Sequence, residues 1–129
     1  MRKNETIAKY SLLAGAIYFA AIATVHLFGI KIPGLYIYYN IPSTQYQDQI
    51  ISFLAFGWAV FFFTAAQNLH IFPSILVAGG VALAALVNIN LSNDFAALKA
   101  GATTTPFWIQ TFLLLLYLLW LLYFYRKSS

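Results

Sequence analysis

Four polar side chains fall inside long apolar segments, each about one helical turn from an end of its segment. They are His26, Asp48, Asn88 and Gln110. Polar groups at that depth are costly in lipid, so they normally face the interior of a helix bundle and find partners there. Because each comes from a different segment, their positions predict one shared polar layer. Such a layer would form a small chamber that opens to one side of a membrane.

His26 and Asp48 are the two members of this layer that can do acid–base chemistry. An imidazole can bind a metal, carry a proton or hydrogen-bond a ligand. Asp48 is the only acidic residue expected within a span, where it can play the same roles or orient the imidazole of His26. Each residue also has a plainer interpretation. His26 can be a packed histidine bonded to a tyrosine or a backbone carbonyl, and Asp48 a carboxylate stabilised by free amides at a helix start.

Amides and a further acid complete the set of candidate ligand-binding residues, which is His26, Asp48, Asn88, Gln110, Asn90 and Asp94. Asn88 follows Gly80 and Ala84 at a spacing of four, so the three share a helix face. Small residues at this spacing let helix backbones approach closely in lipid, and we expect this face to point into the bundle. Amides in such places often serve only as interhelical hydrogen-bond partners, and that alternative stays open.

Catalytic and metal-binding motifs give little support to an enzyme. His26, Asp48 and Asp94 form a weak candidate metal site, without any HxxxH, HExxH or paired ExxH spacing to support it. The chain has no GxSxG nucleophile motif and no GxGxxG or GKS-type phosphate loop. It has no cysteine, which excludes thiolate metal sites and dithiol redox chemistry within the chain. The sequence therefore assigns neither a catalytic residue nor a cofactor.

Composition and hydropathy predict a membrane protein. The chain of 129 residues is 62% hydrophobic and only 8% charged, whereas roughly 25% of the residues in a soluble domain are charged. Its apolar residues form four blocks, and about 20 apolar residues suffice for one transmembrane helix. We expect an all-α, integral membrane, compact four-helix transmembrane bundle that forms a single domain over 1–129. The predicted helices cover about 7–30, 44–66, 73–92 and 106–125.

Local signals place the helix ends and the connections. Pro33 and Gly34 should end the first helix, Thr44 and Gln47 fit a capping box, and Pro73 suits the start of the third helix. The residues 31–43 are expected to form an interfacial loop, and about 95–100 a short surface helix. Aromatic residues near the helix ends are predicted to anchor the bundle at the membrane surfaces: Tyr36, Tyr38, Tyr39, Trp108, Tyr123 and Tyr125.

Basic residues predict the orientation. Those near the two chain ends outnumber those on the other side, with Arg2, Lys3, Lys9, Arg126 and Lys127 against Lys31 and Lys99. The positive-inside rule then places both termini in the cytoplasm, in a bacterial inner membrane or another plasma membrane. The net charge of +4 sits mostly at those ends, which indicates contact with lipid headgroups rather than with nucleic acid.

Three classes of function remain open. The first and preferred one is an accessory subunit that packs against a larger membrane assembly, supported by bulky outward faces and by the small residues Ala16, Ala20 and Thr24 on one side of the first helix. The second is a bundle whose polar layer binds a small ligand or a metal, or carries an enzymatic activity. The third is an oligomeric channel or transporter, although no broken helix marks a midplane site. The expected partners are the lipid bilayer and either a larger complex or further copies of the chain.

Overall fold

Four long α-helices make up the described part of the chain. The computed structural model describes residues 3–32, 35, 44–92 and 105–128. Its elements are α1 (Lys3–Phe28), α2 (Gln45–Gln67), the 3-10 turn η1 (Leu69–Ile71), α3 (Phe72–Leu91) and α5 (Thr105–Ser128). All four α-helices are long and apolar enough to cross a membrane. The predicted all-α architecture, with four helices of membrane-spanning length, is therefore present, and each helix end lies within about one turn of its predicted place.

Several predicted features lie outside the described residues. They are most of the interfacial loop 31–43 with its tyrosines Tyr36, Tyr38 and Tyr39, the acid Asp94, and the short surface helix 95–100.

Helix α1 ends earlier than the sequence predicted. Gly29 has a φ of 68°, the left-handed conformation that glycine adopts without strain. The N–H of Ile30 then donates to the carbonyl of Val25 at 2.8 Å, which satisfies a carbonyl of the last turn. The helix stops at Phe28 because Gly29 closes it, before Pro33 and Gly34 are reached.

The predicted capping box opens α2. The side chain of Thr44 accepts from the N–H of Gln47 at 3.1 Å, and the N–H of Thr44 donates to the side-chain oxygen of Gln47 at 2.9 Å. The opposite end of α2 turns at Asn68. Its N–H donates to the carbonyl of Thr64, and its side chain accepts from the N–H of His70. Pro73 lies in the first turn of α3, as predicted.

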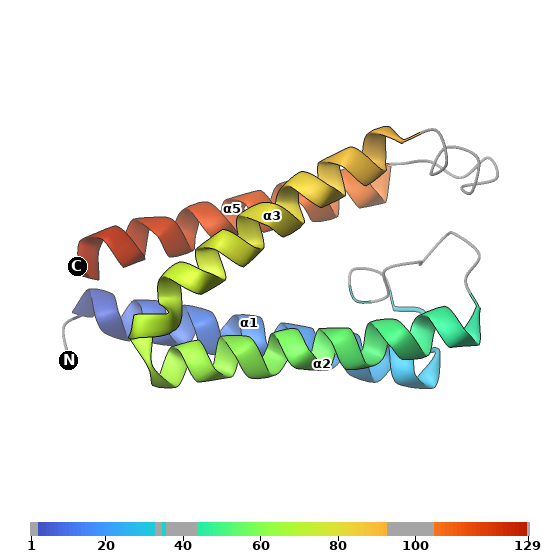
Figure 1. Cartoon of the computed structure of the whole chain (residues 1–129), viewed down its shortest axis with the longest axis horizontal. Coiled ribbons are helices and arrows are strands. Elements are labelled where there is room, and N and C mark those ends of the chain that lie inside the picture. The colour runs from blue at the N-terminus through green and yellow to red at the C-terminus, as the bar shows by residue number, and fades with distance from the viewer. Residues whose placement is uncertain (1–2, 33–34, 36–43, 93–104, 129) are drawn as a thin grey trace.

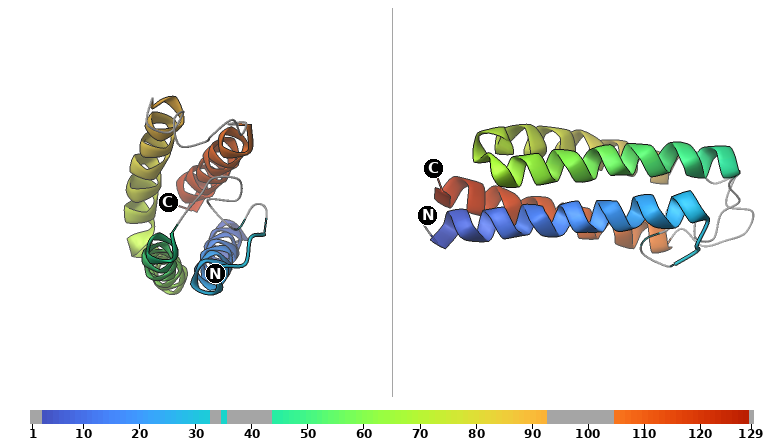
Figure 2. Two further views of the ribbon diagram at one scale, coloured as in Figure 1. Left: turned by 90° about the vertical axis from the view of Figure 1, so that its right-hand side faces the viewer. Right: turned by 90° about the horizontal axis from the view of Figure 1, so that it is seen from below.

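The helices pack as two pairs that diverge along the bundle. In Figure 1, α1 lies beside α2 and α3 lies beside α5, and the views in Figure 2 agree. The start of α1, the turn η1 and the end of α5 lie together at one end of the bundle, here called the terminal end. Toward the opposite end, here called the far end, the α3–α5 pair inclines away from the α1–α2 pair.

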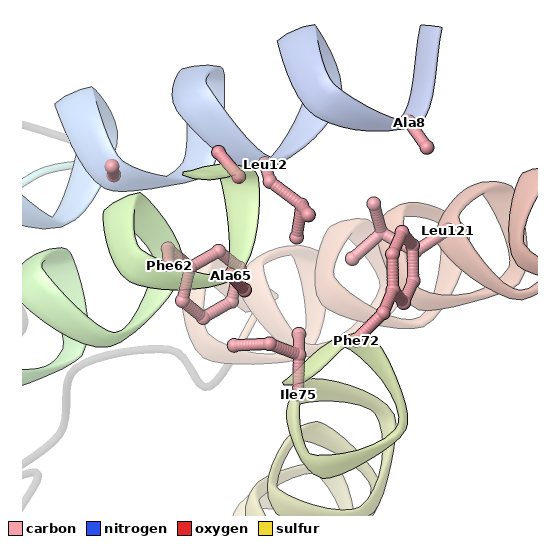
Figure 3. Packing of buried hydrophobic residues seen from close by; sticks show 9 residues of the cluster. Ala8, Leu12, Phe62, Ala65, Phe72, Ile75 and Leu121 are labelled. Carbon is pink, nitrogen blue, oxygen red and sulfur yellow. The ribbon is translucent and has the colours of Figure 1, made fainter. Parts of the chain in front are cut away.

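The main hydrophobic core sits near the terminal end, where all four helices meet (Figure 3). Leu12 of α1, Phe62 of α2 and Leu121 of α5 surround the first turns of α3, which contribute Phe72 and Ile75. The buried residues of α3 are Phe72, Ile75 and Gly79, all in its first half. A second cluster of Ile22, Ala23 and Ala55 continues between α1 and α2 toward the far end. The core therefore binds α1 to α2 over most of their length and holds α3 mainly at its beginning.

Candidate functional site

A buried histidine–aspartate pair joins α1 to α2 near the far end. The Nδ1 atom of His26 lies 3.1 Å from Oδ1 of Asp48. The side chain of His26 is fully buried and that of Asp48 is 11% exposed. A carboxylate beside Nδ1 favours the tautomer that carries its hydrogen there. The structure thus brings together the two candidate residues that can do acid–base chemistry.

The capping box of α2 positions the carboxylate of this pair. Asp48 is in the first turn, and its N–H donates to the carbonyl of Thr44 at 3.0 Å. A carboxylate there is stabilised by the positive end of the helix dipole. One turn further on, the buried hydroxyl of Ser52 donates to the carbonyl of Gln49 at 2.7 Å. Local sequence at the start of α2 therefore places Asp48 opposite the last turn of α1.

A second polar contact joins α3 to α5. The side-chain amide of Asn90 donates to the hydroxyl of Thr111 at 2.9 Å. This hydroxyl in turn donates to the carbonyl of Phe107, also at 2.9 Å. Thr111 is buried and Asn90 is partly buried. The sequence had included Asn90 among the candidates, but its partner Thr111 was missed because a threonine within an apolar helix is common and carries no pattern of its own.

The structure differs from the predicted polar layer at Asn88. The face that carries Gly80, Ala84 and Asn88 is exposed, so the prediction that it points into the bundle is wrong. The glycine that allows close packing is Gly79, since a Cβ atom there would overlap the side chain of Leu118 on α5. A Cβ on Gly80 would meet nothing within 4 Å. The helix is rotated by about one residue from the predicted orientation, which turns Asn90 inward and Asn88 outward.

The remaining candidates are Gln110 and Asp94. Gln110 is partly buried on α5, while Asp94 lies outside the described residues. Within the part of the chain that the structure describes, no three metal-ligating side chains gather. Of the weak candidate metal site, only His26 and Asp48 are therefore placed, and they lie together.

Three of the predicted interface anchors are described, all on α5. Trp108, near the far end, is 37% exposed and Tyr123, near the terminal end, is 55% exposed. Tyr125 is partly buried, and its ring stacks on Phe72 with the centroids 5.3 Å apart. Tyr125 therefore packs against the core as well as lying near a helix end.

A polar network between α1 and α5 was not predicted. The hydroxyl of Tyr117 donates to the carbonyl of Ser11 at 2.8 Å, and the indole N–H of Trp120 donates to the Ser11 hydroxyl at 2.8 Å. A Cβ atom on Gly15 would overlap the Tyr117 hydroxyl and the ring of Phe62, so glycine makes room for this contact. The available signal is the spacing of four between Ser11 and Gly15, which puts both on one face of α1, but the sequence does not indicate their partners on α5.

Taken together, the far end carries a buried His–Asp pair between α1 and α2 and an Asn–Thr pair between α3 and α5. The first can exchange a proton or accept a ligand's hydrogen bond, and the second can link helices. Comparison with protein families, with curated proteins and with solved structures finds no match to this chain.

Proposed function

We propose that this chain is an integral membrane protein that acts as an accessory subunit and packs against a larger membrane assembly through the outer face of α3. The observation that carries this proposal is the exposure of Gly80, Ala84 and Asn88 on one face of that helix. This face is defined here as the α3 outer face.

The chemistry of the α3 outer face suits another helix better than lipid. Glycine and alanine four residues apart allow two helix backbones to come close in a membrane. An amide within a span rarely faces lipid, and Asn88 continues the same stripe one turn further on. A partner helix would cover both features at once, with the amide as a hydrogen-bond donor or acceptor across the contact.

Burial within the chain points to the same helix. In the most apolar stretch of the helical segment Leu69–Leu91, 17% of the residues are buried within the chain, compared with 39% in the corresponding stretch of α1. The stripe on α1 that the sequence favoured for docking is less suitable. Ala16 is in the core and Ala20 is partly buried, which leaves Thr24 exposed. We therefore assign the docking face to α3 in place of α1.

The orientation belongs to this proposal as well. Lys3, Lys9, Arg126 and Lys127 lie at the terminal end, which also carries the acid Glu5. The positive-inside rule then puts this end, with both termini, in the cytoplasm. The His26–Asp48 pair and the Asn90–Thr111 pair would lie near the outer surface.

Native mass spectrometry after gentle extraction from the source membrane tests the accessory role. We expect the wild-type chain to be found with larger chains at fixed stoichiometry, and the variant Gly80→Leu to lose them. Gly80 is exposed and a Cβ atom there meets nothing within 4 Å, so we expect the fold itself to remain intact. The matched control is Ala14→Leu, an equally bulky change at an exposed position of α1, which should leave the association unchanged.

Two results would count against this role. If the wild-type chain is found only as a monomer, it has no such partner. If Gly80→Leu retains the larger chains, the α3 outer face is not the contact. A homo-oligomer that Gly80→Leu disrupts would instead assign this face to a second copy of the chain.

The buried His26–Asp48 pair supports a second candidate function, the binding of a small ligand near the far end. An ionisable pair within a span is a functional candidate by default, because its burial is costly. If the pair is a site, wild-type protein should retain a bound small molecule or metal ion in native mass spectra. His26→Gln and Asp48→Asn should each lose it, whereas Asn90→Ala, at the other polar pair, should keep it.

If the pair only links helices, substitutions of His26 and Asp48 change stability alone. Leaving a buried polar partner unsatisfied costs about 1–3 kcal/mol. His26→Ala and Asp48→Ala should then each lower the free energy of unfolding, and the double variant should lose less than the sum of the two. Strict additivity in unfolding experiments would show that the two side chains do not stabilise the bundle through each other.

A further inference from the structure

A groove on α5 at the terminal end combines basic and apolar side chains. It has a volume of about 470 Å³ and is lined by Leu119, Leu122, Tyr123, Arg126 and Lys127. We call it the α5 groove. Its residues recur at spacings of three and four, so they form one helix face, separate from the α3 outer face.

The polarity of the α5 groove changes along the helix axis. Leu119 and Leu122 are 52% and 40% exposed and lie toward the middle of the span. Arg126 and Lys127 are exposed in the last turn. Eight residues of helix cover about 12 Å, which is more than the headgroup layer of about 5–8 Å on each side of a bilayer. The groove thus presents an apolar part and a cationic part in the order that an amphiphile requires.

An aromatic and a cationic side chain contact each other in the last turns of α5. The Nζ atom of Lys127 lies 5.8 Å from the centroid of the Tyr123 ring, within the range of a cation–π contact. Tyrosine prefers the headgroup level, where its ring is buried and its hydroxyl is hydrated. Tyr123 therefore places the ammonium group at the depth where lipid phosphates lie.

We propose that the α5 groove binds an anionic phospholipid. The phosphate and the negatively charged headgroup lie against Arg126 and Lys127, and an acyl chain lies along Leu119 and Leu122. Charge complementarity selects an anionic over a zwitterionic lipid, because basic groups at a membrane surface attract acidic headgroups. A free phosphate would use the cations alone and would leave the leucines without a role. This proposal is independent of the accessory role, which uses α3.

The test uses the full chain reconstituted in vesicles that contain equal amounts of phosphatidylglycerol and phosphatidylcholine. After gentle detergent release, native mass spectrometry counts the lipids of each class that remain bound. We expect phosphatidylglycerol to be enriched on the wild type and Lys127→Gln to lower this enrichment about fivefold, as the loss of one surface charge predicts. The matched control is Lys3→Gln, which removes the same charge at the same end but does not line the groove. Circular dichroism checks that each variant remains helical.

Every outcome of this experiment either supports or overturns lipid binding in the α5 groove. Enrichment that falls with Lys127→Gln and stays with Lys3→Gln supports it. Equal losses in the two variants would show a general surface charge effect and overturn it, as would a wild type without preference for phosphatidylglycerol. Inorganic phosphate added in excess should leave the bound lipid in place, and its release by phosphate would overturn the assignment of a lipid.

Discussion

Single glycines decide which helices can touch in this bundle. Gly15 on α1 is buried, and any Cβ there would meet the Tyr117 hydroxyl and the Phe62 ring. The space it leaves lets Tyr117 donate to the backbone carbonyl of Ser11 across the α1–α5 contact. Gly57 on α2 faces open space and has no such role in the described structure. Glycines of the same helical conformation therefore differ in importance because of what lies opposite them.

Gly15→Ala should destabilise the bundle. The added methyl group must displace Tyr117 or Phe62, and overpacking of this kind costs about 1–3 kcal/mol. The measurement is the free energy of unfolding in detergent micelles. Gly57→Ala is the control and should be neutral or slightly stabilising, because alanine favours a helix more than glycine does. Equal effects of the two substitutions would contradict the close contact at Gly15.

At the scale of helices, α3 is held at its two ends by different means. Its first half is fixed by Phe72, Ile75 and Gly79, which pack in the core or against Leu118. Its second half has no buried residue and is linked to α5 by the hydrogen bond from Asn90 to Thr111. A single interhelical hydrogen bond therefore matters more here than it would in a fully packed helix pair.

Thr111→Val should weaken the α3–α5 contact. Valine keeps the shape of threonine but removes the acceptor for Asn90, at a cost of about 1 kcal/mol. Hydrogen exchange at the backbone amides of the last turn of α3 should also increase. Asn88→Ala is the control on the exposed neighbouring face, and in the isolated chain it should leave stability and exchange unchanged. A larger loss with Asn88→Ala than with Thr111→Val would mean that Asn88 and not Asn90 faces α5.

For the whole molecule, the four long helices of the described residues alternate in direction, which brings the start of α1 and the end of α5 to the terminal end. The same end carries the main core and the α5 groove, while the two polar pairs lie at the far end, where the helix pairs diverge. The molecule is therefore divided along its length into an end where all four helices share one core and an end where the helix pairs diverge.

Cysteine labelling tests the proposed orientation directly, because the natural chain has no cysteine. Asn4→Cys and Gln67→Cys lie at the terminal end, and Gln45→Cys lies at the far end. None of these substitutions changes the charge that governs topology. A membrane-impermeant maleimide should label Gln45→Cys in intact cells, and the other two only after permeabilisation. The reverse pattern would place the termini outside, and labelling of Asn4→Cys and Gln67→Cys on different sides would contradict the four-span arrangement.

The sequence by itself determined the helices and several of their ends. Length and hydropathy are properties of single segments, and the capping box of Thr44 and Gln47 depends on residues three apart, so both can be read without knowing the neighbours. The same reasoning proposed that Asp48 could orient His26, and the structure places the two in contact. Both residues stand out because ionisable groups are rare in apolar helices.

Only the tertiary structure decided which side of α3 faces the bundle. Adjacent residues on a helix differ by about 100° in direction, so the choice between Gly79 and Gly80 reverses the roles of Asn88 and Asn90. That rotation depends on how α3 packs against Leu118 and Thr111 of α5. Because apolar residues occupy every side of α3, hydropathy along the chain contains no signal that distinguishes a lipid-facing side from a helix-facing one.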